Sequence, residues 1–113
     1  MRTVGIGTVA GVSADEVLAA VDAVLPPDST EVELATLDVR TGEPGLVEAA
    51  ERRGWPLRGY RGAELEGVAV PAPSRRVAEL VGTPSVAEAA VLLGGRPLLV
   101  GKTVHGRVTV AVS

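Results

Sequence analysis

Two serine and glutamate pairs in this sequence have the spacing of a helix start that presents backbone amides. Ser13 precedes Glu16 by three residues, and Ser85 precedes Glu88 by the same interval. In such a capping box the serine hydroxyl accepts a hydrogen bond from one unpaired amide, and the glutamate carboxylate accepts one from another. The amides that remain unpaired at a helix start attract anions. The pattern therefore predicts two places that attract an anionic group.

The segment Gly82–Ala90 around the second pair is the most informative in the chain, because it combines a turn, a helix start and an apolar helical face. An equally possible start has Thr83 as the N-cap of this helix and Pro84 in its first turn. We interpret Ser85 and Glu88 first as a capping box. Contact with a ligand is a second role that the pattern leaves open.

A glycine-containing loop leads into the first helix start. Gly5, Gly7 and Gly11 precede Ser13, but Thr8-Val9-Ala10 fills the interval before Gly11. The spacing is therefore not that of a dinucleotide-binding fingerprint, and the motif of a nucleoside triphosphate loop is missing as well. A tight strand-to-helix turn explains these glycines as well as anion or ligand binding does. Loops at the carboxyl ends of parallel strands are the usual ligand edge of such sheets, which keeps the second interpretation open.

Other polar residues fit both a chemical and a structural role. Asp38, Arg40 and Glu43 follow a predicted strand and can orient a polar substrate or a water molecule, although their types are also those of turns and helix caps. The structural interpretation is favoured. Lys102, the only lysine, can pair with a carboxylate of a ligand or with that of Glu88.

The residue types exclude several kinds of chemistry. There is no cysteine, so a disulfide framework, a thiolate nucleophile and a cysteine-ligated zinc are excluded. The only histidine, His105, is predicted to lie in a hairpin turn, where the pattern supports neither a zinc site nor a Ser-His-Asp triad. The sequence predicts no cofactor and no metal.

Length and charge favour one small acidic domain. The 113 residues predict a single domain, 1–113, with one hydrophobic core. The net charge is −3 and the only aromatic residues are Trp55 and Tyr60, which argues against a nucleic-acid surface. We find no secretory signal or membrane-spanning segment, so a cytoplasmic location is the expectation.

The first half of the chain alternates predicted strands and helices. Strands are expected at Thr3–Gly7, at Val32 to Leu37 or Asp38, and at Pro56–Tyr60. Helices are expected at Ser13–Leu25, before Pro26-Pro27, and at Leu46–Arg53, before Gly54. This order favours parallel strands joined by right-handed crossovers, with helices on the faces of the sheet.

The second half follows a different pattern. We expect one helical turn at 63–66, a helix from Ser74 to Val81, and a helix after Gly82 that ends at Gly94-Gly95. Pro97–Val100 and Val108–Val112 are predicted as strands, with His105-Gly106 in a hairpin turn between them. The predicted fold is an α/β three-layer α/β/α sandwich with a mixed sheet, made of parallel N-terminal strands and a C-terminal antiparallel hairpin.

Several separated motifs are informative when they are taken together, and the most specific is Gly82-Thr83-Pro84-Ser85-Val86-Ala87-Glu88-Ala89-Ala90. In chain order the other motifs are Gly5-Ile6-Gly7 with Gly11-Val12-Ser13, Thr36-Leu37-Asp38-Val39-Arg40 with Glu43-Pro44-Gly45-Leu46, Val70-Pro71-Ala72-Pro73-Ser74 with Val77, and Lys102 with Val108-Thr109-Val110-Ala111. Together these motifs resemble a known family, the CobE / CbiG carboxyl-terminal domain family of cobalamin biosynthesis, and the match spans nearly the whole chain.

The resemblance implies an α/β domain that acts in corrin-ring assembly. In that family, CbiG proteins open the lactone ring of a cobalt-precorrin and release acetaldehyde, and they carry additional amino-terminal domains. A free-standing domain is similar to CobE. The family commonly has a basic loop between its first glycines, whereas Thr8-Val9-Ala10 here is neutral.

Three hypotheses follow from the resemblance. In the first, the domain binds a corrinoid or precorrin and assists its processing, with Gly5, Gly7, Gly11, Ser13, Arg40, Thr83, Ser85 and Lys102 as candidate contacts. In the second, it is part of a lactone hydrolase, in which Asp38, Glu43 or Glu88 activates water. In the third, it is an interaction module that contacts other enzymes of cobalamin biosynthesis. Whether the domain is itself an enzyme stays open.

Overall fold

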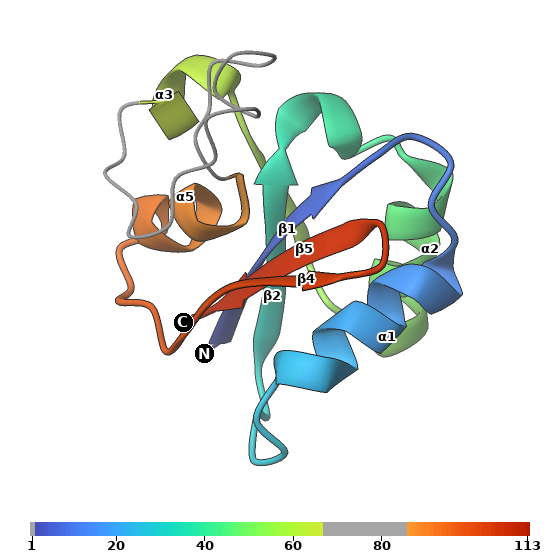
Figure 1. Ribbon diagram of the computed structural model, residues 1–113, viewed down its shortest axis with the longest axis horizontal. Coiled ribbons are helices and arrows are strands. Elements are labelled where there is room, and N and C mark those ends of the chain that lie inside the picture. The colour runs from blue at the N-terminus through green and yellow to red at the C-terminus, as the bar shows by residue number, and fades with distance from the viewer. Residues whose placement is uncertain (1, 67–85) are drawn as a thin grey trace.

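The computed structural model describes residues 2–66 and 86–113, and its centre is the first strand of a five-stranded sheet. The strands are β1 (Arg2–Thr8), β2 (Val32–Leu37), β3 (Leu57–Tyr60), β4 (Val100–His105) and β5 (Val108–Val112), in the spatial order β3-β2-β1-β5-β4. β1 pairs in parallel with β2, and β2 with β3, whereas β5 is antiparallel to both β1 and β4 (Figure 1). The mixed sheet with parallel N-terminal strands and a C-terminal hairpin is therefore confirmed.

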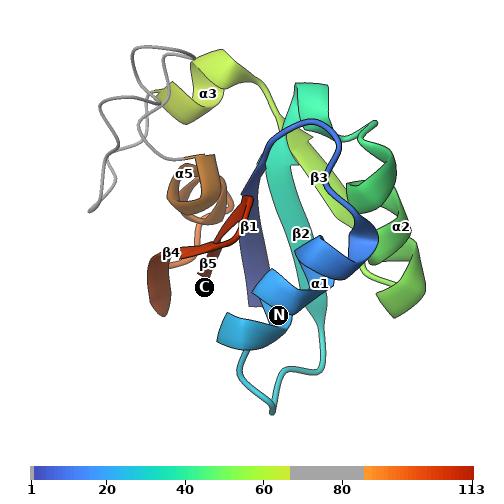
Figure 2. The same cartoon turned by 45° about the vertical axis from the view of Figure 1, so that its right-hand side comes forward.

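Helices cover both faces of this sheet. α1 (Ala14–Val24) and α2 (Pro44–Arg53) lie together on one face, and α3 (Gly62–Glu66) and α5 (Val86–Leu93) lie on the other (Figure 2). A short 3-10 helix, η1 (Asp38–Arg40), follows β2. Among the described residues, none of the helices has the length and apolar character needed to cross a membrane. The predicted three-layer arrangement is confirmed.

Alternation along β1 separates the two layers of the core. The side chains of Val4 and Ile6 are fully buried in the cluster beneath α1 and α2. Gly5 points to the opposite face, where a Cβ would lie 1.8 Å from the carbonyl oxygen of Ala87. Glycine at this position lets α5 pack directly on the backbone of the central strand, because any larger side chain would occupy the place of the helix.

The first predicted helix start is confirmed in detail. The Oγ of Ser13 accepts a hydrogen bond from the backbone N of Glu16 at 3.1 Å, and the N of Ser13 donates to Oε1 of Glu16 at 3.3 Å. α1 ends at Val24, and its C-cap Leu25 directly precedes the two prolines. α2 ends at Arg53 and is capped by Gly54, whose positive φ of 69° is the usual helix-terminating conformation of glycine. The predicted helix from Ser74 and the helix starts at Thr83 and Ser85 lie outside the described residues.

The prediction of a strand at Pro97–Val100 was wrong, because β4 begins where that segment ends. Val100 pairs with Val112 and His105 with Val108, so the tight turn is Gly106-Arg107 and His105 is the last residue of a strand. The side chain of Leu98 instead packs against the cluster of Ala87, Val91 and Ala111 beside α5. An apolar run of this length does not distinguish a strand from a connection that is held against the core.

Candidate functional site

Three connections meet at the carboxyl edge of the parallel strands. They are the β1–α1 loop (residues 9–13), the segment from η1 to Glu43 after β2, and the hairpin tip Gly106-Arg107. The pairing of Thr8 with Val108 brings the hairpin tip next to the end of β1. Figure 1 shows the tip of the red hairpin beside the blue loop that enters α1. This edge is the one at which open α/β sheets usually bind ligands.

Gly11 is held from both sides of the β1–α1 loop. Its N donates a hydrogen bond to Oε1 of Glu43 at 3.0 Å, and its carbonyl oxygen accepts one from Nη2 of Arg107 at 3.3 Å. The φ of Gly11 is +87°, which favours glycine, and a Cβ there would meet nothing within 4 Å. One backbone unit thus links the loop to the start of α2 and to the hairpin tip.

The carboxylate of Glu16 joins the helix cap to the hairpin tip. Arg107 donates from Nε to Oε2 of Glu16 at 2.9 Å and from Nη2 to Oε1. The hydrogen bonds from Arg107, followed by the backbone N–H of Ser13, lower the pKa of Glu16 to about 2. The same contact raises the pKa of Arg107, so both groups are charged across the physiological pH range.

The charged residues of η1 face outward at the same edge. Asp38 is exposed and Arg40 is partly exposed, and within residues 2–66 and 86–113 neither side chain forms a salt bridge. A Cβ on Gly59 would lie 3.0 Å from the Cα of Asp38, so η1 packs closely on β3. The backbone of η1 is therefore fixed, while the charges of Asp38 and Arg40 remain accessible to a ligand.

Glu88 and Lys102 meet each other away from this edge. The carboxylate of Glu88 is 1% exposed and its Oε2 accepts a hydrogen bond from the backbone N of Lys102 at 3.0 Å. The sequence left open a pairing of the charged Lys102 side chain with Glu88, and the structure shows the two residues in contact through the backbone amide of Lys102. Because Glu88 belongs to α5, it lies on the face of the sheet opposite to α2, whose first turn follows Glu43.

The predicted ligand contacts in and after β1 also lie on two different faces of the sheet. Gly5 and Gly7 point to the α5 face, where a Cβ on Gly7 would lie 3.8 Å from the Cβ of Val86. Gly11 and Ser13 lie in the loop toward α1, on the other face. The start of α5 is therefore beside β1, but α1 and α5 begin on opposite faces of the sheet.

Arg107 is a residue of this edge that the sequence did not indicate. It follows Gly106, which has a positive φ of 61°, in the two-residue turn. The signal that identifies it is the pairing of the last strand with the first, because that pairing alone brings Arg107 to Gly11 and Glu16. No local pattern around residue 107 shows this pairing.

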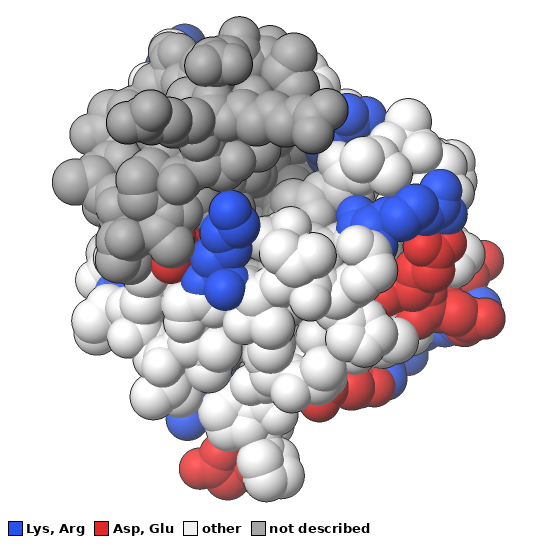
Figure 3. All heavy atoms as spheres, in the orientation of Figure 1, with Lys and Arg blue, Asp and Glu red and all other residues white. Residues whose placement is uncertain are grey.

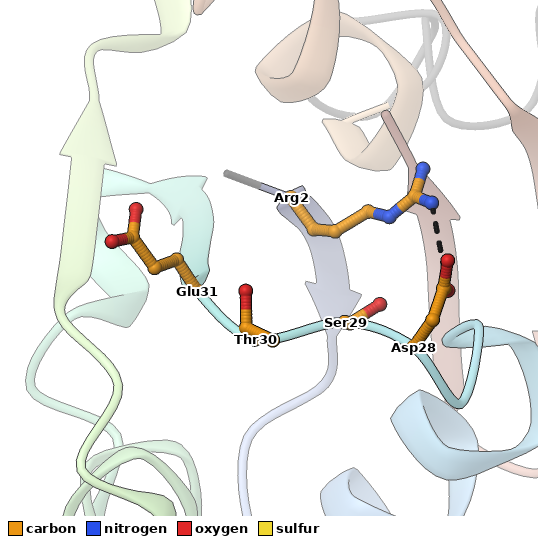
Figure 4. A pocket seen from close by; sticks show the side chains of 5 residues that line it. All are labelled: Arg2, Asp28, Ser29, Thr30 and Glu31. Atoms are coloured by element: carbon orange, nitrogen blue, oxygen red, sulfur yellow. Dashed lines mark ion pairs between the residues drawn. The ribbon is translucent and has the colours of Figure 1, made fainter.

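A cavity of about 240 Å³ opens at the opposite, amino-terminal edge of the sheet. It is lined by Arg2, Asp28, Ser29, Thr30 and Glu31. Figure 4 shows Arg2 reaching toward Asp28, with an ion pair of 3.8 Å, while the carboxylate of Glu31 points to the other side. The guanidinium of Arg2 also donates to the carbonyl oxygen of Ser113 at 3.0 Å. The polar groups of this cavity therefore do not converge on one point.

A mixed sheet between two helical layers, with polar loops gathered at the carboxyl edge of its parallel strands, defines the class as an α/β sandwich domain. Residues 2–113 match the family described as cobalamin synthesis G C-terminus. The chain belongs to this family, and it is a cobalamin biosynthesis protein of the CobE and CbiG carboxyl-terminal type.

Individual relatives agree with this assignment. The chain is 29% identical over 116 residues to the cobalt-precorrin-5A hydrolase of Priestia megaterium, and this match covers 97% of the chain but 31% of the relative. The crystal structure of CobE, a protein from the cobalamin (vitamin B12) biosynthetic pathway, has a TM-score of 0.87 and 30% identity, over 99% of this chain and 91% of CobE. The cobalamin biosynthesis protein chiG from Agrobacterium tumefaciens has a TM-score of 0.70 and 32% identity, over 99% and 96% of the two chains.

Proposed function

We propose that the domain binds a corrinoid or precorrin intermediate of cobalamin biosynthesis at the carboxyl edge of its sheet and assists the processing of that intermediate. Such a ligand is a broad apolar macrocycle with acetate and propionate groups at its rim. A site for it needs apolar side chains for the ring and cations or amides for the carboxylates. Membership of the family supports the ligand class.

One observation supports the position of the site. Val9 and Val39 are 49% and 72% exposed at the ends of β1 and β2, and Arg40 lies next to Val39 without a salt bridge among the described residues. The Gly11–Glu43 hydrogen bond holds the two loops together. Exposed apolar side chains beside a cation are the combination that a carboxylated macrocycle requires.

A titration tests this function. Purified protein is added to hydrogenobyrinic acid, and the absorption bands of the corrin are followed. We expect a saturable change, with affinity reduced about fivefold by Arg40→Gln, because one charge-assisted hydrogen bond to a carboxylate is lost. Val39→Ser should also weaken binding. Leu99→Ser is the matched control, because Leu99 is similarly exposed at 57% but is hydrogen-bonded to Val112 at the opposite edge.

Two outcomes of this titration would contradict different parts of the proposal. Unchanged corrin absorption at high protein concentration would refute ligand binding. Equal losses in the Leu99→Ser and Val39→Ser variants would refute the position of the site, because the two residues lie at opposite edges of the sheet.

A lactone-hydrolase component is a second candidate, favoured by the hydrolase relative and by two carboxylates at the proposed edge. The chain spans about a third of that relative, so we propose that hydrolysis requires the remaining part of such a protein. Glu43→Gln is a sharp test, because glutamine retains an oxygen for the N–H of Gly11 but is not a base. Loss of acetaldehyde release in a reconstituted reaction, with the loop intact, would support Glu43 as the base. Unchanged release would exclude it.

A further inference from the structure

Arg107 occupies a position from which one side chain can fix the whole β1–α1 loop. Its guanidinium binds both carboxylate oxygens of Glu16 and the carbonyl oxygen of Gly11. Glu16 in turn binds the backbone N of Ser13. Both ends of the segment Gly11–Ser13 therefore depend on Arg107. The arginine binds Gly11 directly and binds Ser13 through Glu16.

The three elements that these contacts join are distant along the chain. Arg107 and Glu16 are 91 residues apart, and Gly11 and Glu43 are 32 residues apart. The hairpin tip is held in place by the pairing of β5 with β1, so it is a rigid support for the arginine. Arginine suits this position because its planar fork can serve a carboxylate and a carbonyl at once, which the single ammonium of lysine cannot do in the same geometry.

We propose that Arg107 is a positioning residue that holds the β1–α1 loop in the conformation that receives the corrinoid. This inference rests on the function proposed above, and it assigns no direct contact between Arg107 and the ligand. The loop carries Val9, one of the apolar side chains of the proposed site. A loop fixed before binding loses less conformational entropy when the ligand arrives, so the clasp of Arg107, Glu16 and Gly11 increases affinity.

Two variants and one control test the proposal. Arg107→Gln removes the charge and the fork, whereas Arg107→Lys keeps the charge. Arg53→Gln is the control, because Arg53 also forms a two-bond pair with a carboxylate, Asp22, at 2.9 and 2.8 Å, and also lies 5.3 Å from the ring of Trp55. This control pair joins α2 to α1, and none of its hydrogen bonds among the described residues reaches the loop.

The first measurement needs no ligand. The exchange rate of the Gly11 amide with solvent is measured by NMR in each variant. We expect Arg107→Gln to accelerate this exchange about fivefold relative to the wild-type protein, Arg107→Lys to accelerate it less, and Arg53→Gln to leave it unchanged. Urea unfolding should show no larger loss of stability for Arg107→Gln than for Arg53→Gln, which would separate loop positioning from general destabilisation.

The second measurement is the affinity for hydrogenobyrinic acid. We expect the same order, with Arg107→Gln about fivefold weaker than wild type, Arg107→Lys intermediate and Arg53→Gln unchanged. If the Gly11 amide of the Arg107→Gln variant exchanged at the wild-type rate, the proposal that Arg107 fixes the loop would be overturned. Faster exchange with unchanged affinity would overturn the positioning role. Failure of the wild-type protein to bind the corrin would instead refute the proposed function, and the exchange data would still decide whether Arg107 fixes the loop.

Discussion

The two glycines of β1 that face α5 differ in what a methyl group would meet. A Cβ on Gly5 would overlap the backbone of Ala87 at 1.8 Å, while on Gly7 it would touch Thr109 and Val86 at 3.7 and 3.8 Å, which is ordinary packing. We expect Gly5→Ala to lower the free energy of unfolding by about 3 kcal/mol, because α5 must move, and Gly7→Ala to lower it by less than about 1 kcal/mol. Urea unfolding of the two variants checks this. Equal costs would show that α5 does not pack on Gly5.

The lowered pKa of Glu16 makes the stability of the protein depend on pH. Its pKa is about 2 in the folded protein and near the ordinary glutamate value of 4.5 when unfolded, so its contribution to stability is fully present above pH 4.5. That contribution is lost as the pH falls from about 4.5 toward 2, because the unfolded chain takes up the proton first. We expect Glu16→Gln to reduce the loss of stability between pH 5 and pH 3. NMR titration of the Glu16 carboxyl carbon measures the pKa directly, and a value near 4.5 would contradict the clasp.

The sequence reveals those residues of the site whose contacts are close along the chain. The Ser13 cap depends on residues three apart, so the sequence alone was sufficient. The roles of Glu43 and Arg107 depend on contacts with Gly11 across 32 and 96 residues, and only the folded chain shows these. Whether the loop before this helix start also offers a free amide depends on the fold, because the Gly11 amide is already bound by Glu43.

At the scale of the element, the start of α1 can be tested by its cap. We expect Ser13→Ala to lower the free energy of unfolding by about 1 kcal/mol, since the N–H of Glu16 loses its acceptor. Ser13→Gly is the comparison, with an expected cost of only a few tenths of a kcal/mol, because glycine is tolerated at this position. Denaturant unfolding at pH 7 measures both. A larger loss for the glycine variant would mean that the cap hydroxyl is not the stabilising group.

The strands of this protein show why some elements were predictable and one was not. β1 and β2 are short apolar runs that lead into turn and helix signals, and they lie where the sequence placed them, within a residue or two. β4 contains Gly101, Lys102 and Thr103 and has an irregular register between Val100 and Thr103. An edge strand with a bulge has no clear alternation of apolar and polar residues, so the sequence favours the apolar run before it as the strand.

Across the whole molecule, oppositely charged side chains gather on the layer that α1 and α2 form. Salt bridges between α1 and α2, such as those of Arg52 with Asp15 and of Arg53 with Asp22, cover one side of the protein. Figure 3 shows acidic and basic side chains interspersed on the right-hand side, while the centre of this face is largely white, with basic side chains to its left and right. The salt bridges of the described residues mostly involve helical side chains, and Arg40 at the carboxyl edge takes part in none of them.

The two faces of the sheet have one natural probe each, which makes their coupling measurable. Trp55 packs against the cluster beneath α1 and α2, and Tyr60 is buried in the cluster beneath α5. They are the only tryptophan and tyrosine of the chain. We expect their transitions in urea to coincide, because β2 contributes side chains to both clusters and α5 packs on the backbone of β1, so neither face can unfold while the sheet remains.

Tryptophan fluorescence excited at long wavelength and tyrosine absorption follow the two transitions in the same samples. Leu34 and Ala35 are neighbours in β2 that enter opposite clusters. Leu34→Ala should therefore shift both transitions together, by an amount set by a loss of about 3 kcal/mol. A Tyr60 transition that precedes that of Trp55, or a Leu34→Ala variant that shifts only the Trp55 signal, would show two independent folding units where the sequence predicts a single domain.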